Sequence, residues 1–312
     1  MTVVEAPIDS YRALTQGCGL LDRSERGKLA LVGPAAKEFL GGQVTNDVEG
    51  LTPGTGCYAA FLTNKGKMLG DLRVLDLGGE LFVDTERPTL QPLFNLVHRG
   101  LIGWDAELEK RTLERGLLSL IGPAASDVAG VSFAAEHANR PVSIGGVAAV
   151  AVATDLGVDL ICDAADSGAL AAALRAAGVV PVEEAAAEIV RVEHGRPRYG
   201  IDLDDTVIPQ EAGLNDRAVS FTKGCYIGQE TVARLHWRGK PNRHLRGLLL
   251  STPVASGAEL RLGDRVVGVV GTSVVSPRLG PIALALVRRE AEPGASLAVD
   301  GGATASVVEL PF

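Results

Sequence analysis

The sequence predicts an α+β protein with antiparallel sheets and a small β-barrel at its C-terminal end. Three observations support this fold class: an internal repeat at residues 29 and 118, paired strand patterns after each copy, and a series of short strands after residue 243. Strands joined by tight turns, with helices between groups of strands, are typical of α+β proteins and not of a doubly wound parallel fold.

The repeat consists of two similar segments, residues 29–36 (LALVGPAA) and residues 118–125 (LSLIGPAA), each followed by an apolar helical pattern. In both copies a short apolar strand ends at a glycine. A proline then opens the helix, because its fixed φ suits the first helical turn. The two copies predict two related units that pack together.

The other elements of the first two-thirds of the chain follow from apolar periodicity and turn residues. Alternation with a period of two between glycine-containing turns predicts strands, whereas apolar residues three and four apart predict helices. A glycine directly after a helical pattern marks its end. The predicted elements are strands at residues 58–62, 68–77, 80–84 and within 142–162, and helices at residues 87–99, 167–177 and 183–194.

From residue 243 onward, glycine and proline divide the chain into short β-rich segments. Six such segments in about seventy residues predict a small barrel. They cover residues 245–250, 258–262, 265–273, 282–287, 296–299 and 303–309.

These elements predict three domains, which a chain of 312 residues is long enough to form. Residues 1–112 together with 185–240 form a discontinuous α+β domain. Residues 113–184 form a second, related α+β domain, and residues 241–312 form the barrel domain.

Composition excludes several classes of protein. Hydrophobic residues make up 46% of the chain and charged residues 22%, as in soluble globular proteins. No apolar run reaches the ~18 residues that a bilayer requires, and the first residues lack the basic start and apolar stretch of a secretory signal. We therefore expect a cytoplasmic protein without membrane contact. The net charge of −8 argues against extensive nucleic-acid binding.

One local segment is nevertheless basic. Residues 231–258 contain no acidic residue. Two interpretations are open: a solvated basic face, or an anion site for phosphate, RNA or the glutamate tail of a cofactor. The basic side chains of this segment, called the basic run below, are Arg234, Arg238, Lys240, Arg243 and Arg246.

Cysteine and histidine spacing predicts no metal site. The four cysteines lie far apart, without a CxxC or Cys/His pair at ligand spacing, and the five histidines show no HxxxH or HxH pattern. Cys18, Cys57 and Cys162 lie in apolar or glycine-rich surroundings, so we expect them to be packing residues.

Cys225 differs from these because it lies in the segment KGCYIGQE (223–230), a few residues before a helical pattern at 231–237. Unpaired N–H groups and the helix dipole lower the pKa of a nearby thiol, and Lys223 adds a positive charge. The alternatives are a reactive thiolate and a buried inert thiol.

Arg191 and Glu193 lie near the end of a predicted helix, before the loop GRPRYG (195–200). A carboxylate in this position can bind an amidine-like edge, such as that of a pterin, a guanine or an arginine, through two parallel hydrogen bonds. The alternative is a surface or salt-bridged helix residue.

Several of these segments resemble one known superfamily, in the same order and spacing. The octapeptide KGCYIGQE resembles the signature of the YgfZ family, whose mitochondrial relatives assist maturation of [4Fe–4S] proteins. The resemblance covers nearly the whole chain, from about residue 10 to the barrel. Motifs similar to those of the glycine-cleavage T-protein (GcvT) superfamily are QVTNDV (43–48), R-x-E-x-G (191–195), YGID (199–202) and PQEAGL (209–214).

The resemblance implies a GcvT-like cloverleaf of three domains around a central channel that holds tetrahydrofolate or a one-carbon derivative. It also implies that Glu193, the glutamate of the R-x-E motif, hydrogen-bonds the pterin. Arg191 and Tyr199 belong to the same motifs and are expected to bind the cofactor. Arg234 begins the basic run, which is expected to meet the anionic tail of the folate.

Two departures from the aminomethyltransferase pattern point to the expected subfamily. Aminomethyltransferases carry two adjacent aspartates after the first hairpin, whereas residues 67–72 (KMLGDL) retain only Asp71. This carboxylate is expected to bind near the folate N5 and to orient it or exchange a proton; the alternative is an ordinary polar strand residue. Cys225 replaces an acidic or polar residue, and a thiol there changes the available chemistry.

The leading hypothesis is therefore a tetrahydrofolate-binding accessory factor for assembly or repair of iron–sulfur enzymes, including those that modify tRNA, with Asp71 and Cys225 as its chemically active residues. One cysteine cannot hold a [4Fe–4S] cluster, which usually takes four thiolates. Cys225 would thus contact a cluster only transiently and together with a client or assembly protein, or act as a thiol relay. The alternatives are a folate-dependent aminomethyltransferase or demethylase, and an RNA-binding factor that uses the basic run.

Overall fold

The computed structural model describes residues 3–312 and separates the chain into two compact units. The barrel unit consists of Met1–Tyr11, Glu183–Leu214 and Glu230–Phe312, and the two-sheet unit of Arg12–Val182 and Asn215–Gln229. Residues 185–214, which the predicted domains join to the first α+β domain, cluster here with the barrel. The reason is that a helix in this segment packs on a barrel strand.

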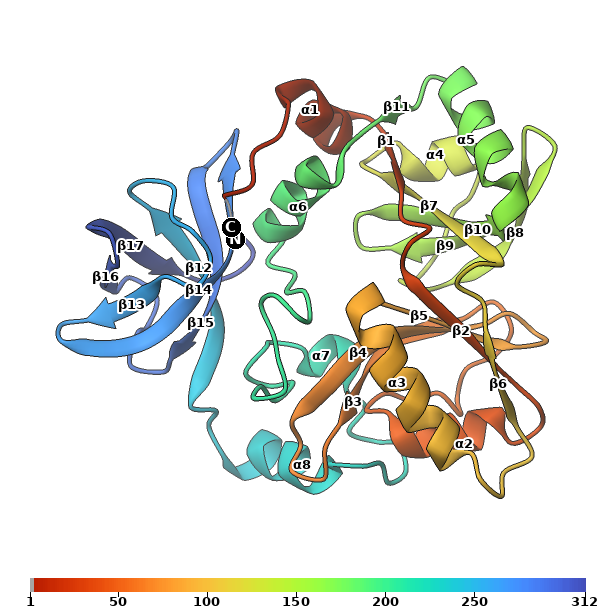
Figure 1. The fold of residues 1–312 in the computed structure, drawn as a ribbon, viewed down its shortest axis with the longest axis horizontal. Coiled ribbons are helices and arrows are strands. Elements are labelled where there is room, and N and C mark those ends of the chain that lie inside the picture. The colour runs from red at the N-terminus through yellow and green to blue at the C-terminus, as the bar shows by residue number, and fades with distance from the viewer. Residues whose placement is uncertain (1–2) are drawn as a thin grey trace. The chain divides into compact units, whose positions relative to one another are not determined.

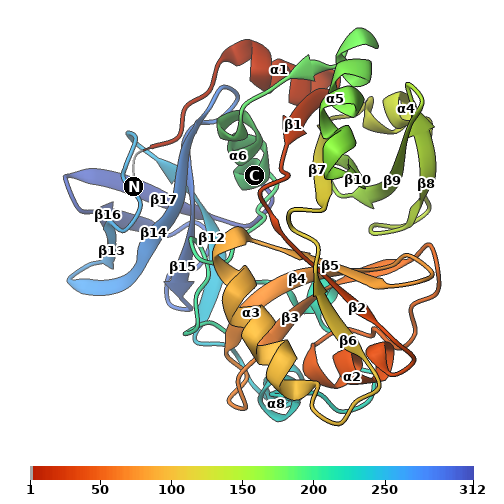
Figure 2. The ribbon, with the colours of Figure 1, turned by 45° about the vertical axis from the view of Figure 1, so that its right-hand side comes forward.

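One sheet of the two-sheet unit has the strand order β3-β4-β5-β2-β6 and is antiparallel throughout. Helix α3 lies along it (Figure 1 and Figure 2) and buries Leu93 and Val97 in a core shared with Phe39 of α2. The elements are β2 (Gly27–Val32), α2 (Ala36–Gln43), β3 (Gly56–Leu62), β4 (Met68–Asp76), β5 (Leu81–Thr85), α3 (Arg87–Gly100) and β6 (Glu107–Lys110).

The other sheet of this unit has the order β11-β1-β7-β10-β9-β8 and is antiparallel except where β1 pairs with β11. Leu170 and Leu174 of α5 pack into its core. A smaller cluster that includes Phe82 and Ile161 packs strands of the two sheets together. The elements are β1 (Gly19–Asp22), β7 (Arg115–Ile121), α4 (Ala125–Ala129), β8 (Asn139–Ile144), β9 (Val147–Thr154), β10 (Gly157–Asp163), the 3-10 helix η1 (Ala164–Asp166), α5 (Ser167–Ala176) and β11 (Val180–Pro181).

The predicted repeat is a structural repeat. Gly33 directly follows strand β2 and Gly122 directly follows strand β7, with φ of 110° and 123°, a region that glycine adopts without steric penalty. Each glycine and its proline lead into a helix, α2 or α4, whose N-cap alanines have nearly identical φ of −91° and −90°. The prolines precede the N-caps and do not occupy the first helical position, which is the one difference from the prediction.

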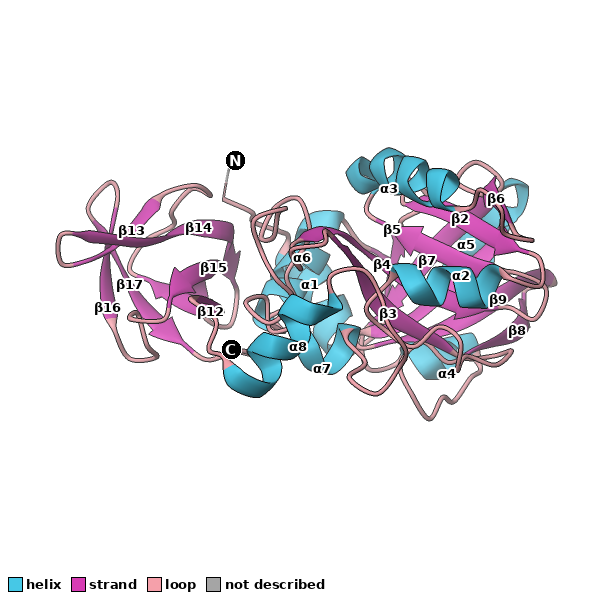
Figure 3. Ribbon diagram, turned by 90° about the horizontal axis from the view of Figure 1, so that it is seen from below, coloured by secondary structure: helices cyan, strands magenta, loops and turns pink. Residues whose placement is uncertain are grey.

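The barrel unit contains the predicted C-terminal barrel, closed in the order β12-β15-β14-β13-β16-β17. From Arg243 to Phe312, a fully described stretch, the chain forms strands and loops without a helix (Figure 3), and each of the six predicted strands is present. The strands are β12 (Arg243–Leu250), β13 (Glu259–Leu262), β14 (Arg265–Ser276), β15 (Gly280–Arg288), β16 (Ser296–Val299) and β17 (Ala303–Val308).

Helix α6 (Glu184–Glu193) packs on β14, and its residues from Ala186 onward are buried. Three further helices are α1 (Ile8–Gln16), α7 (Asn215–Ala218) and α8 (Gln229–Arg238). Of these, α8 contains the helical pattern predicted at residues 231–237, whereas α1 and α7 lie outside the predicted elements. Among residues 3–312, no helix combines the length and the apolar character that a membrane-spanning segment requires.

Candidate functional site

Asp71 lies on β4 with its carboxyl group buried beside Tyr58 of β3. The two strands pair so that Ala60 is opposite Asp71, which places Tyr58 two residues along on the same face of the sheet. The Tyr58 hydroxyl donates a hydrogen bond to Asp71 Oδ2 at 2.5 Å. Burial raises the pKa of Asp71 to about 6, although the hydrogen bond from Tyr58 acts in the opposite direction.

Asp71 and Tyr58 line a cavity of about 190 Å³ within the two-sheet unit, called the Asp71 cavity below. Its walls come from both sheets, because Asp159 of β10 also lines it, and His137, which precedes β8, lines it as well. The volume suits a ring-sized part of a ligand and is smaller than that of pockets that enclose a whole cofactor. Cys225 is not among the residues that line it.

A buried ion-pair network forms one wall of this cavity. Arg73 Nε donates to Asp84 Oδ2 at 2.6 Å, and Arg73 Nη1 donates to Asp159 Oδ2 at 2.7 Å. Arg26 donates to Asp84 Oδ1 at 2.8 Å and also contacts Glu86. Burial alone would raise the pKa of Asp84, but the two arginines outweigh burial and lower it to about 2. Both guanidinium groups are thus held by carboxylates of the protein.

Glu193, the predicted pterin ligand, lies at the C-terminal end of α6 with a buried carboxyl group. The Tyr11 hydroxyl lies 3.0 Å from Oε1 and 3.2 Å from Oε2, and Ser276 donates to Oε1. The more exposed Arg278 lies 3.7 Å from Oε2. A carboxylate has about four lone-pair positions, so these two hydroxyl donors leave acceptor capacity on Glu193.

Arg191, two residues earlier on α6, is fully engaged within the barrel unit. It makes a bidentate pair with Glu188, at 2.9 and 2.8 Å, and donates to Asp202 Oδ2 and Thr272 Oγ1, both at 2.8 Å. The Arg196 carbonyl oxygen accepts its remaining hydrogen bond. An arginine has five N–H donors, and all five are used here. Their acceptors lie on α6, on the following loop and on β14, so this side chain holds the three together. Its predicted role in cofactor binding stays a prediction.

Tyr199 and Arg234 are the other predicted cofactor-binding residues of the barrel unit. Tyr199 is half-buried and forms a bridge with Leu203. Arg234 is exposed on α8. Two later members of the basic run are ion-paired inside the unit, Arg243 with Glu211 and Arg246 with Glu309, both at 2.9 Å. The solvent-facing charge of the run is therefore smaller than the sequence suggests.

Cys225 is exposed in the loop that precedes α8. Lys223, which the sequence places beside it as a positive charge, donates instead to the backbone carbonyl oxygens of Gly41, Val44 and Asn46. This ammonium group anchors the start of the KGCYIGQE segment to the last turn of α2 and to the loop after it. The three remaining cysteines of the chain, all within the described part, are buried as predicted.

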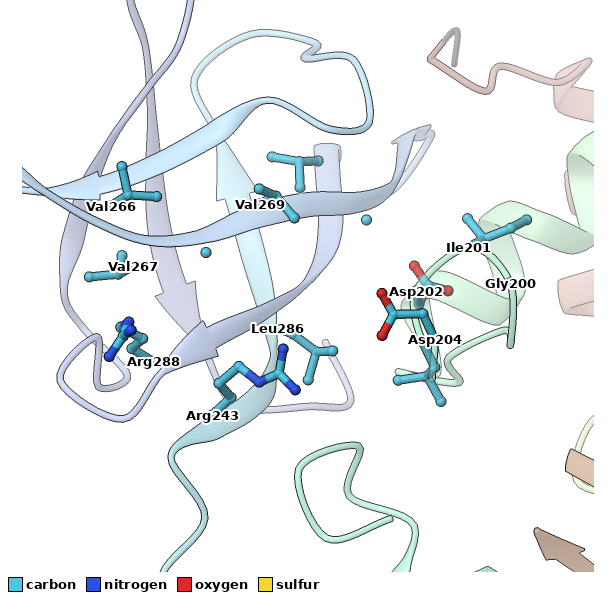
Figure 4. Close-up of a pocket in the computed structure, with 14 residues that line it drawn as sticks. Gly200, Ile201, Asp202, Asp204, Arg243, Val266, Val267, Val269, Leu286 and Arg288 are labelled. Atoms are coloured by element: carbon cyan, nitrogen blue, oxygen red, sulfur yellow. The ribbon is translucent and has the colours of Figure 1, made fainter. Parts of the chain in front are cut away.

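The barrel unit carries a separate groove of about 590 Å³ (Figure 4). Val266, Val269 and Leu286 supply its apolar surface, and Arg243 and Asp204 supply charged groups. Among the described residues of this unit, none of the predicted site residues lines the groove. We found no group of three His, Cys, Asp or Glu side chains placed to hold a metal ion in residues 3–312.

Sequence reasoning did not identify Tyr58, His137, Tyr11 or Ser276 as site residues. The signal for Tyr58 was available, because the turn at residues 64–66 sets a hairpin register that brings Tyr58 near Asp71. Tyr11 and Ser276 are separated from Glu193 by 182 and 83 positions, and no local pattern indicates such contacts.

Comparison with known families agrees with this architecture. Residues 2–223 match the family described as the GCVT N-terminal domain, and residues 243–312 match the glycine cleavage T-protein C-terminal barrel domain. The chain belongs to the glycine-cleavage T-protein (GcvT) family. Its GcvT-like fold, with mixed α/β domains and a closed barrel, is confirmed.

Several similar proteins of the GcvT family are named aminomethyltransferases. An aminomethyltransferase of Geobacillus kaustophilus is 31% identical, covering 97% of this chain and 89% of the relative. An aminomethyltransferase of Streptomyces coelicolor is 29% identical, covering 89% and 80%. The crystal structure of the glycine cleavage system aminomethyltransferase T from Bartonella henselae has a TM-score of 0.86 and 25% identity, covering 97% and 88%.

A putative chloroplast transferase of Arabidopsis thaliana is 25% identical, covering 97% of this chain and 73% of the relative. None of these relatives is named for a role with iron–sulfur enzymes. Membership of the GcvT family is therefore established, whereas the YgfZ subfamily stays a prediction from the octapeptide KGCYIGQE.

Proposed function

We propose that this chain binds a reduced folate next to Asp71 and that Asp71 exchanges a proton at the folate during one-carbon transfer, with an aminomethyl group as the transferred unit. The observation that carries the proposal is the buried Asp71 carboxyl group, whose pKa is raised to about 6 in the Asp71 cavity. A proton-transfer group works best when its pKa lies near the operating pH.

The residues present fit a folate. Asp71 Oδ2 accepts the hydrogen bond of Tyr58, and His137 Nδ1 is buried in the same cavity without a hydrogen-bond partner among the described residues. A buried polar atom without a partner is costly, so a polar ligand in this cavity would relieve that cost. A bound reduced folate supplies the nitrogen pair that carries the one-carbon unit.

The chain's own residues give Asp71 a defined geometry. Tyr58 holds Oδ2, which leaves Oδ1 to accept or release a proton. The Thr85 hydroxyl donates to the Asp71 backbone carbonyl at 2.6 Å and so fixes the strand at this point. Because Arg73 and Arg26 are bound by Asp84, Asp159 and Glu86, neither is free to move onto Asp71 and hold it in the ionised form.

Aminomethyl transfer is favoured over the non-transferase hypothesis by the names of the relatives. A second candidate, the accessory factor for iron–sulfur enzymes, is favoured by one observation: Cys225 is exposed, and the three other cysteines, all described, are buried. The two candidates require different residues. Transfer depends on Asp71, whereas the accessory function depends on Cys225.

Purified protein with tetrahydrofolate and an aminomethylated lipoyl carrier tests both candidates. On the transferase proposal, ammonia and methylene-folate form, Asp71→Asn lowers kcat about 10²- to 10⁴-fold, and Cys225→Ser has no effect. Asp127→Asn is the matched control, because Asp127 is exposed on α4 of the same unit. Absence of turnover, together with loss of [4Fe–4S] enzyme activity in cells that carry only Cys225→Ser, would favour the accessory function.

A further inference from the structure

His137 lies in the Asp71 cavity with one ring nitrogen unused. The residue is 9% exposed, and its Nδ1 has no hydrogen-bond partner within residues 3–312. Its backbone is well held, since its N–H donates to the Ala153 carbonyl oxygen at 2.9 Å and its carbonyl oxygen accepts from Asn139 Nδ2 at 3.3 Å. The ring is therefore fixed in the cavity by its backbone and not by a partner of Nδ1.

The backbone of His137 is also unusual. Its φ is 66°, the left-handed region, and no other non-glycine residue of the described chain has a positive φ. Histidine, asparagine and aspartate enter this region more readily than other side chains, but the conformation still costs free energy. Such conformations occur frequently where a side chain must be held in a functional position.

The neighbours of the ring determine which nitrogen carries the proton. Glu136 Oε1 lies 3.5 Å from His137 Nε2, and Arg217 pairs with the same carboxyl group. A carboxylate beside Nε2 favours a proton on that nitrogen, so Nδ1 presents a lone pair. Burial lowers the pKa of His137 to about 4, and the ring is consequently neutral at physiological pH.

The charged groups of the cavity then define what a ligand must supply. Arg73 Nε and Nη1 donate to Asp84 and Asp159, as described above, so the charge of Arg73 is balanced by carboxylates of the protein. Two acceptor positions in the cavity, Asp71 Oδ1 and His137 Nδ1, are the ones that a ligand can use as acceptors. A ligand group that matches two acceptors is a donor with several N–H bonds. A primary amine meets this requirement, whereas a carboxylate or phosphate does not.

We propose that His137 Nδ1 accepts a hydrogen bond from the amino group of the substrate, so that the Asp71 cavity is a primary-amine subsite. The inference rests on the proposed function, because it takes the one-carbon donor to be an aminomethyl compound. The cavity volume of about 190 Å³ compares with about 30 Å³ per water molecule in the liquid, so a small amine has room. His137 selects the amine, and Asp71 accepts or supplies the proton.

Nitrogen NMR of the folate-free protein, labelled with ¹⁵N-histidine, tests the subsite without turnover. Methylammonium chloride is the probe, and tetramethylammonium chloride at the same ionic strength is the control because it has no N–H donor. We expect the Nδ1 resonance of His137 to shift and saturate with methylammonium only, while Nε2 retains its proton. Equal responses to the two salts, or a proton on Nδ1 in the free protein, would overturn the inference.

Two variants remove the imidazole ring of His137 and keep the left-handed backbone conformation. His137→Asn and His137→Gly both tolerate a positive φ, so both are expected to fold. We expect KM for the aminomethyl donor to rise about tenfold in His137→Asn and about a hundredfold in His137→Gly, with an unchanged Kd for tetrahydrofolate. An unchanged KM in both variants contradicts the subsite even when transfer occurs. If wild-type protein neither binds tetrahydrofolate nor transfers, yet Nδ1 responds to methylammonium, the proposed function fails and the amine subsite remains.

Discussion

Arg73 Nη1 donates to Asp159 Oδ2 at 2.7 Å, and this buried ion pair joins the two sheets of the two-sheet unit. Ser119 donates to the other oxygen of Asp159 at 2.6 Å, while Arg73 Nε reaches Asp84 of its own sheet. The wall of the Asp71 cavity is therefore part of the structure that holds the sheets in register.

Arg73→Ala is expected to lower the free energy of unfolding by about 3–5 kcal/mol, because it leaves Asp159 buried without its arginine partner and leaves Asp84 with Arg26 alone. Urea unfolding measures the change. Arg115→Ala is the matched control, since Arg115 pairs with Asp163 at 2.5 Å across the same β7–β10 ladder but at an exposed position, where about 0–1 kcal/mol is expected. Equal effects of the two substitutions would contradict the role of burial.

Asp71→Asn is expected to stabilise the protein at neutral pH while it impairs transfer. An acid whose pKa rises on folding stabilises fully below its ordinary pKa, and this contribution is lost as pH rises through the folded value, here from 3.8 to about 6. The difference of about 2.2 units corresponds to about 3 kcal/mol above pH ~7. Below pH ~4 the variant and wild type should be equally stable. Unfolding curves across this range check the sign, and lower stability of the variant at pH ~8 would contradict it.

Tyr58→Phe is expected to raise the pKa of Asp71 above its wild-type value. The hydroxyl hydrogen bond stabilises the ionised carboxyl group and opposes the effect of burial. A hydrogen bond to a charged group contributes about 1.5–3 kcal/mol, or about one to two pKa units. A ¹³C NMR titration of the aspartate carboxyl groups measures this pKa directly. Tyr226→Phe is the control, because Tyr226 is buried in the same unit but does not line the cavity.

Features that depend on residues close together in the sequence were predicted, whereas features that depend on distant residues were not. The barrel strands and the Gly-Pro repeat were predicted because period-two alternation and turn residues act within a few positions. The Tyr58–Asp71 contact is within reach of the same reasoning, since one hairpin sets it. Arg73 and Asp159 are 86 positions apart, and their pairing depends on how two sheets pack, which a single sequence does not encode locally.

The site residues show the same limit. Glu193 was identified by its motif, but its hydroxyl partners come from the N-terminal segment and from β14. The sequence did not single out His137, because no metal-ligand spacing surrounds it, whereas the fold buries it in the Asp71 cavity in a left-handed conformation. Neither its burial nor its φ has a signal in the neighbouring residues.

Cys225 is expected to react with a thiol reagent much faster than the other cysteines. It is exposed, whereas burial raises the pKa of Cys57 to about 12 and that of Cys18 to about 11, which suppresses their thiolates. Native protein should therefore release one rapid equivalent of thionitrobenzoate from Ellman's reagent. Cys225→Ser removes this phase and Cys57→Ser retains it. A rapid phase that survives Cys225→Ser would show that another cysteine is accessible.

Asp202 holds the loop after α6 against the barrel, and Asp202→Asn tests how much that connection contributes. The side chain is fully buried: Oδ1 accepts from the Thr272 N–H at 2.7 Å, and Oδ2 accepts from Arg191 Nη1 at 2.8 Å and from the Arg198 N–H at 2.9 Å.

Asparagine has the same shape, but its amide N–H₂ group takes the place of one of the two oxygens that accept these hydrogen bonds. A donor then faces a donor, and Arg191 also loses a counter-ion. We expect the free energy of unfolding to fall by about 3–5 kcal/mol. Asp204→Asn is the control, because Asp204 is exposed and accepts from Thr206, and surface changes stay within about 0.5 kcal/mol. Thermal unfolding of the full chain measures both. An Asp202→Asn midpoint equal to that of Asp204→Asn would mean that α6 and the barrel remain together without this carboxylate.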